Sequence, residues 1–306
     1  MLSSEVKKTT PTWDAGRRRV ASLPMSTHVP ADPSAAPADP LAALAALPGV
    51  ADSVAGMRTA VDRVYGHRVM RRRSAEITAE AALRGARGSA ALAGADWALE
   101  EVRRRSDFSG DTEARTVGAA LRLTAEAGQL LSVWRQSPLR VLARLHLLAA
   151  GGAGDDRAVG RPRLAGETVD EPLVEAPLPD AAEASGRLDG LAGLIGAGSS
   201  APALVIAAVT HGELLALRPF VSHNGLVARA AERIVLIGAG LDPKSVCPAE
   251  VGHAEQGRAA YLAAFDGYLS GTPEGMAAWI AHCGRSVELG ARESMAVCEA
   301  LQRGAA

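Results

Sequence analysis

The feature that most constrains the fold is an apolar pattern with a spacing of three and four residues, which recurs through most of the chain. Such spacing places apolar side chains on one face of a helix. The pattern occupies residues 54–70, 117–133, 139–148, 188–195, 203–217, 226–237, 259–269 and 276–297. Alanine fills many of these positions and only 3% of residues are aromatic, so we predict an all-α bundle of closely packed helices.

Two irregular segments interrupt the helical pattern. Residues 1–48 are rich in Pro, Ala, Ser and Asp, a composition that buries too little apolar surface to offset the entropy of ordering. We therefore predict a disordered tail over 1–48, a helical region over 49–135 and a core over 136–306. Residues 151–179, punctuated by Gly and Pro, predict a long loop or a small hairpin around 162–174.

Composition limits the classes of partner. The 306 residues carry a formal net charge of -1, without the clustered positive charge that makes nucleic acid a main partner. The cysteines Cys247, Cys283 and Cys298 have no metal-ligand spacing, and their odd number argues against a disulfide framework, which favours a cytoplasmic location. No apolar run reaches the roughly 18 residues of a membrane helix. The charged N-terminus, whether it starts at Met1 or Met25, does not look like a secretion signal.

One short segment, RPFVSHNGLVAR beginning at Arg218, joins two helical patterns. Its Asn-Gly turn signal at Asn224 places free backbone N–H groups at a helix N-terminus, where they attract anions. His223 and Arg229 lie nearby, so phosphate binding is one interpretation. The other is a simple connection in which Pro219 ends one helix and Asn224 caps the next.

The same segment resembles the signature of Fic-fold proteins (the Fido superfamily), H-P-F-x-[D/E]-G-N-G-R-x-x-R, without a gap. The matching positions are Pro219, Phe220, Asn224, Gly225 and Arg229. The flanking segments are also similar, and the resemblance covers residues 54–297. It implies a Fic-like helical bundle whose long loop is a flap, a protein partner or target, and ATP with Mg²⁺ as the nucleotide.

The resemblance also implies which residues occupy the positions of the chemistry. Fic enzymes typically transfer AMP from ATP to a target hydroxyl, using a histidine as base, an acidic residue for Mg²⁺ and a first arginine for phosphate. Here these positions hold Arg218, Ser222 and Leu226, and His223 replaces the first loop glycine. Arginine stays protonated and cannot act as a base. A serine offers only a neutral ligand to Mg²⁺.

The signature still assigns several residues to phosphate or nucleotide binding. These are Asn224, Gly225, Arg229, His223 and Arg218. We assign no residue to a metal. Because the base and metal positions are altered, we also assign no catalytic residue. His223 as a displaced base is an alternative that depends on its reach and orientation.

A second resemblance lies upstream, in RGSAALAGADWALEEV, residues 87–102. It is similar to the inhibitory helix of Fic proteins, whose pattern is [S/T]-x-x-x-E-[G/N]. Ser89 and Gly94 match, whereas Ala93 stands at the glutamate position. In the family that glutamate pairs with the last arginine of the signature, so we expect Arg229 to lack this partner.

Other polar residues have simpler interpretations. His146 and His211 lie on apolar helical faces and are expected to be core histidines. The loop carboxylates of Asp155, Asp156 and Glu171 are expected to be solvated.

Three functions remain open. The first is a catalytically degenerate Fic-fold protein that acts by binding a partner, with or without a nucleotide in a remnant pocket. The second is an active nucleotidyl- or phosphotransferase with altered chemistry, in which Arg218 stabilises phosphate. The third is a helical interaction module that binds no nucleotide. We favour the first, because base, metal ligand, loop glycine and phosphate clamp are altered together.

Overall fold

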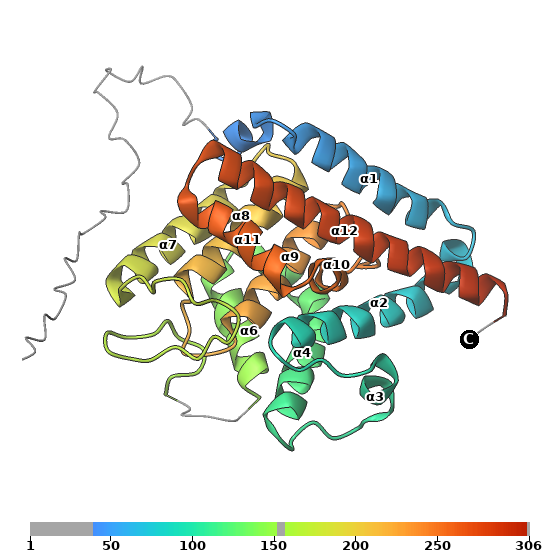
Figure 1. Cartoon of the computed structure of the whole chain (residues 1–306), viewed down its shortest axis with the longest axis horizontal. Coiled ribbons are helices and arrows are strands. Elements are labelled where there is room, and N and C mark those ends of the chain that lie inside the picture. Colours follow the sequence, from blue (N-terminus) through green and yellow to red (C-terminus); the bar gives the residue numbers. More distant parts are fainter. Residues whose placement is uncertain (1–38, 152–156, 305–306) are drawn as a thin grey trace, which may run out of the picture. The chain divides into compact units, whose positions relative to one another are not determined.

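Helices make up nearly all the regular structure of the chain in a computed structural model, which describes residues 39–151 and 157–304 (Figure 1). The elements in order are η1 (Ala42–Ala46), α1 (Val50–Gly66), α2 (Met70–Leu92), α3 (Leu99–Arg104), α4 (Thr112–Ala127), η2 (Gly128–Leu130), α5 (Leu131–Trp134), α6 (Pro138–Ala150), α7 (Ala181–Ala197), α8 (Ala203–Leu217), α9 (Asn224–Gly238), α10 (Ala249–Gln256), α11 (Arg258–Ser270) and α12 (Pro273–Gln302). The predicted all-α fold is confirmed. None of the helices described is long and apolar enough to cross a membrane.

Most predicted helices are found close to their predicted bounds. The pattern over 203–217 coincides with α8, and those over 139–148, 226–237, 259–269 and 276–297 lie within α6, α9, α11 and α12. Helix α7 begins earlier than predicted, because the Asp180 carboxylate accepts a hydrogen bond from the Glu183 N–H at 2.8 Å and caps its first turn.

Two predicted helices are wrong in extent. The pattern over 54–70 is not one helix. Helix α1 ends before His67, whose backbone is extended, and α2 begins at Met70. The pattern over 117–133 is divided among α4, η2 and α5, with a change to 3-10 winding at Gly128. The apolar spacing continues through both breaks, so it could not predict them. They are visible only in the backbone conformation.

The two irregular segments need separate corrections. Of the predicted tail, residues 1–38 lie outside the described part, whereas 42–46 form η1 and are ordered by Asp39, whose carboxylate accepts a hydrogen bond from Ser200 N at 2.7 Å. The described residues of the predicted loop, 151 and 157–179, contain no helix or strand, as predicted. The alternative hairpin does not occur among its described residues, where the only β-type pairing is a parallel bridge between Asp170 and Ser222. Asp155 and Asp156 also lie outside the described part.

Helix α9 is the centre of the bundle. It packs against α8, α4 and α6, and 14 of its 15 residues are buried. Helix α12, red in Figure 1, is the longest helix and packs along α1, α10 and α11. Polar side chains of α9 also reach other helices, because Arg229 bonds Ser89 of α2 and Glu232 contacts His253 of α10.

Helices α10 and α12 touch through their backbones. A side chain on Gly252 of α10 would collide with the backbone of Ser286 on α12, and one on Gly290 of α12 would collide with the backbone of Pro248. Glycine is therefore required at both positions for this approach. The contact fixes the position of His253, which follows Gly252 in the chain.

Candidate functional site

The signature segment connects α8 to α9 at the edge of a cavity of about 820 Å³. Its walls come from α4, the end of α6, the loop near Glu171 and the start of α9. Ala93, at the position of the family's inhibitory glutamate, also lines it. The predicted segments thus meet at one cavity, although they are far apart in the sequence.

Asn224 fixes the shape of the signature loop. Its Oδ1 accepts a hydrogen bond from the Phe220 N–H at 2.9 Å, and its Nδ2 donates to the Phe220 carbonyl at 2.9 Å. Both residues are buried. Asn224 is the only asparagine in the 306 residues. Its role is to hold the loop, and the N–H at the start of the helix that faces the loop near Glu171 is that of Gly225.

Arg218 points away from the cavity. Its backbone is left-handed, with φ of 40°, and its side chain turns into the loop, where Nη2 donates to the Pro177 carbonyl at 2.7 Å and Nη1 to the Val174 carbonyl at 3.4 Å. Burial lowers the pKa of its guanidinium, an effect that nearby Glu171 opposes. Arg218 therefore anchors the loop around Val174 and Pro177, and phosphate binding by this residue stays a prediction.

Arg229 is buried against α2. Its Nε donates to Ser89 Oγ and its Nη2 to the Ser89 carbonyl, both at 2.9 Å. Ala93 offers Arg229 no carboxylate, and the arginine is held instead by Ser89, the serine of the same pattern, one turn before Ala93. Gly94 follows in a left-handed conformation, with φ of 94°, where α2 has ended.

Glu171 occupies the N-terminus of α9. Its Oε2 accepts a hydrogen bond from the Gly225 N–H at 2.8 Å, and its Oε1 accepts one from the Leu173 N–H at 3.3 Å. The pairing of Asp170 N with the Val221 carbonyl at 2.8 Å brings it there. Glu171 is partly exposed, but its carboxylate also fills the position to which a helix N-terminus attracts an anion, a contact that the expectation of a solvated carboxylate did not include.

Ser222 and His223 form a polar pair on the cavity wall. Ser222 Oγ lies 2.8 Å from His223 Nδ1 and 3.5 Å from His146 Nε2. His146 Nδ1 accepts a hydrogen bond from the Gly160 N–H at 3.0 Å, and its ring stacks on Phe220 with centroids 4.3 Å apart. Burial lowers the pKa of His146 to about 4 and also lowers that of His223. Both imidazoles are therefore neutral near pH 7.

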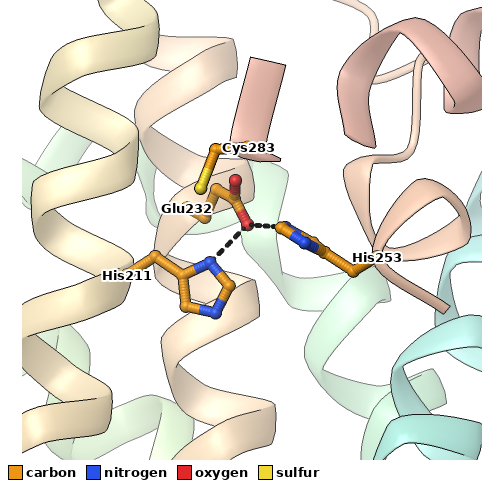
Figure 2. Close-up of side chains that lie close together, drawn as sticks. All are labelled: His211, Glu232, His253 and Cys283. Atoms are coloured by element: carbon orange, nitrogen blue, oxygen red, sulfur yellow. Dashed lines mark hydrogen bonds and ion pairs between the residues drawn. The ribbon is translucent and has the colours of Figure 1, made fainter. Parts of the chain in front are cut away.

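A second polar cluster, which the sequence did not predict, lies deep between α8, α9, α10 and α12 (Figure 2). It consists of His211, Glu232, His253 and Cys283, and their ligand atoms lie within 4.8 Å of one another. Glu232 Oε2 is 2.9 Å from His211 Nδ1 and 2.9 Å from His253 Nε2. His211 is buried as predicted, but its neighbours are ionisable groups.

The cluster is sealed from solvent. All four side chains are at most 1% exposed. Burial lowers the pKa of His211 to about 4 and raises that of the Cys283 thiol well above its usual value. Burial also acts to raise the pKa of Glu232, but His253 and His211 outweigh it and hold that pKa below its usual value. An ionised carboxylate thus faces imidazole nitrogens and a thiol.

No family model matches the sequence, and no curated protein does. Among solved structures the chain is similar to a Fic family protein from Desulfovibrio desulfuricans, with 19% identity and a TM-score of 0.65 over 82% of this chain and 75% of that one. It is also similar to a fragment of Fic-1 from C. elegans, with 15% identity and a TM-score of 0.58 over 82% of this chain and 73% of the fragment. A variant of that fragment matches with 17% identity and a TM-score of 0.56, over 80% and 70%. At these identities the likeness establishes the fold.

Proposed function

We propose that this chain, which has the Fic fold, does not transfer AMP and acts instead as a binding or regulatory protein for a protein partner. The observation that carries the proposal is the hydrogen bond from the Gly225 N–H to Glu171 Oε2, at 2.8 Å. A phosphate at this helix N-terminus would meet the Glu171 carboxylate, and two anions at one short separation repel each other. The chain therefore holds its own anion in the remnant pocket.

The remaining chemical positions support the same conclusion. Arg218 is bonded to loop carbonyls and carries a charge that prevents it from accepting a proton. Ser222 Oγ shares a hydrogen bond with His223 Nδ1 and offers no carboxylate to a hard cation. ATP with Mg²⁺ therefore does not fit the pocket as it is arranged, and no transfer step can be derived through it.

Labelling tests the absence of transfer. Incubation of the full chain with α-labelled or γ-labelled ATP, Mg²⁺ and a cell lysate is expected to label no protein. A protein labelled by the wild type, but not by a boiled sample, would overturn the proposal.

The internal anion is tested separately by calorimetry with ATP and Mg²⁺. We expect no measurable heat for the wild type, and binding for Glu171→Ala, because removal of the carboxylate frees the Gly225 N–H. Glu175→Ala is the matched control, since Glu175 is an exposed carboxylate of the same loop. Equal binding by the wild type and Glu171→Ala would show that Glu171 does not exclude the nucleotide.

Partner binding at the cavity is tested with a bulky side chain. Thr116 lines the cavity and bonds the carbonyl of Thr112, four residues earlier, at 2.9 Å. Thr59 of α1 bonds the Ala55 carbonyl in the same way and lies outside the cavity. Crosslinking in cells should lose partner bands with Thr116→Trp and keep them with Thr59→Trp. Identical bands for both variants would place any partner elsewhere.

A second candidate function is a transferase in which His223 replaces the lost base. It is favoured by one observation, that His223 lines the cavity, is neutral near pH 7 and contacts the Ser222 hydroxyl. If that function holds, the labelling assay gives a signal that His223→Ala abolishes. The absence of label from the wild type excludes it.

A further inference from the structure

Four helices each contribute one candidate metal ligand to the cluster shown in Figure 2. His211 comes from α8, Glu232 from α9, His253 from α10 and Cys283 from α12. The set combines two imidazoles, a carboxylate and a thiol, which together suit Zn²⁺ better than hard cations such as Mg²⁺ or Ca²⁺. A packed core does not need such a set, because apolar side chains of similar volume would fill the space.

The separations fit a small ion. Bond lengths of about 2.0–2.3 Å to a tetrahedral Zn²⁺ place ligand atoms about 3.3–3.8 Å from one another. The atoms here range from 2.9 Å, between Glu232 and each histidine, to at most 4.8 Å across the set. Shifts of about an ångström would therefore convert the cluster into a coordination shell, without movement of a helix.

Two polar atoms in the cluster have no hydrogen-bond partner. They are Glu232 Oε1 and His211 Nδ1, two of five such buried side-chain atoms in the described residues. His211 Nδ1 lies 2.9 Å from Glu232 Oε2 but in a direction that forms no hydrogen bond. When the His211 proton is on Nε2, facing Tyr261, the Nδ1 lone pair and the carboxylate oxygen repel each other unless a cation lies between them.

The outer nitrogens of both histidines have suitable partners. His211 Nε2 lies 2.6 Å from Tyr261 Oη, and His253 Nδ1 lies 2.8 Å from Ser286 Oγ. Ser286 in turn can donate to the His282 carbonyl at 3.0 Å. When the inner nitrogens bind a metal, the outer N–H groups donate to these hydroxyls, the outer arrangement that metal-bound histidines use.

We propose that His211, Glu232, His253 and Cys283 bind one Zn²⁺ ion in a closed structural site. The binding nitrogens are His211 Nδ1 and His253 Nε2. On binding, Cys283 loses its thiol proton to solvent and the Zn–S bond forms. The two positive charges of the ion are then balanced by the thiolate and the Glu232 carboxylate, so the buried site is neutral.

The site holds the bundle together and does no chemistry. None of the four residues lines either of the two larger cavities in the described structure, and four protein ligands leave no position for a substrate. The ion crosslinks α8, α9, α10 and α12, which are far apart in sequence. Its removal is therefore expected to lower stability.

The direct test is metal analysis of the full chain, purified with its affinity tag removed. We expect one Zn²⁺ per chain, and a fall in the melting temperature when a chelator removes it and the ion is then withheld. Refolding with Co²⁺ should give the absorption of a tetrahedral site together with a thiolate-to-cobalt band. Protein that contains no metal, and that neither Zn²⁺ nor Co²⁺ stabilises, would overturn the proposal.

A pair of cysteine variants separates this site from adventitious binding. Cys283 and Cys298 both lie on α12 and are fully buried, but only Cys283 belongs to the cluster. Cys283→Ser should lose the thiolate-to-cobalt band and stabilisation by Zn²⁺, whereas Cys298→Ser should keep both. Loss of the band in Cys298→Ser alone would contradict the assignment. If Cys283→Ser does not fold, the Co²⁺ spectrum of the wild type still decides the proposal.

Discussion

The two polar regions of α9 differ in what they leave for a ligand. At its N-terminal end the Gly225 N–H, which would hold a phosphate, already bonds Glu171, and Arg229 bonds Ser89. In its second half Glu232 keeps one carboxylate oxygen without a partner. Both regions leave buried atoms unpaired, but at the signature these are the donor-only nitrogens Arg218 Nε and Arg229 Nη1, whereas in the cluster that no motif indicated they are Glu232 Oε1 and His211 Nδ1, which can bind a cation. Unsatisfied buried groups are the more direct guide to a binding site.

The regions also differ in access to solvent. The signature loop borders a cavity of about 820 Å³, large enough for a nucleotide-sized or peptide ligand. The cluster of His211, Glu232, His253 and Cys283 has no such opening, so its occupant would be an ion bound during folding. One region is therefore open to exchange with solvent, and the other is closed to it.

The largest expected effect is at the loop, in Asn224→Ala. The Phe220 N–H and carbonyl both lose their buried partner, and each unpaired group costs about 1–3 kcal/mol. We expect a fall of about 2–4 kcal/mol in the free energy of unfolding, measured by urea denaturation. Asn224→Asp keeps the acceptor and should lose less. A fall below about 1 kcal/mol would show that the loop does not depend on this amide.

Acid should weaken the loop region through His146. Burial, with a smaller contribution from His223, lowers its pKa from 6.5 to about 4, so the unfolded chain binds the extra proton first as pH falls. Stability is full above pH 6.5 and declines from pH 6.5 to 4, by about 3 kcal/mol from this group. Denaturation across that range should show a shallower decline for His146→Gln. An unchanged decline would exclude His146 as a source of acid sensitivity.

Removal of the Tyr261 hydroxyl tests how the partners of the cluster contribute to the free energy of unfolding. Tyr261→Phe leaves His211 Nε2 without its partner at 2.6 Å, which should lower the free energy of unfolding by about 1–2 kcal/mol. In the presence of Zn²⁺ the loss of this outer contact should weaken metal affinity about 10–100-fold. Competition with a chelator measures this change. A loss larger than that of Asn224→Ala would reverse the ranking of the two regions.

The smallest effect concerns Glu171. Its carboxylate bonds the N-terminus of α9, where a negative charge contributes about 0.3–1 kcal/mol. Glu171→Ala should lower the free energy of unfolding by about 1 kcal/mol, and less at high salt. Glu175→Ala should leave it unchanged. A stabilised Glu171→Ala chain would indicate that the carboxylate strains the loop instead.

The sequence predicted local structure better than it predicted contacts. The bounds of α8 and the start of α9 could be read from apolar spacing and the Asn-Gly pair, because both depend on neighbouring residues. The direction of the Arg218 side chain could not be predicted from the sequence, since it depends on carbonyls about 40 residues earlier in the loop. Glu171 reaches Gly225 across 54 residues, so nothing near either residue indicates the pairing.

The cluster was missed for the same reason, although one signal was present. Its ligands are spaced by 21, 21 and 30 residues, from 211 to 232, 253 and 283, which matches no metal motif. They meet through the packing of α8 on α9 and the close approach of α10 and α12 at glycines. The available signal was Glu232 itself, a carboxylate within the apolar pattern of a helix that proved to be buried on all sides.

The burial of α9 along 14 of its 15 residues has a thermodynamic consequence. Such a helix cannot shift at its N-terminus without repacking around Glu232, seven residues beyond Gly225. The binding of a ligand that displaces Glu171 from the helix is therefore linked to the binding of an ion by Glu232. If the ligand changes the affinity of the chain for the ion, the ion changes the affinity for the ligand by the same factor. Measuring either affinity with the other site filled and empty would give the size of that coupling.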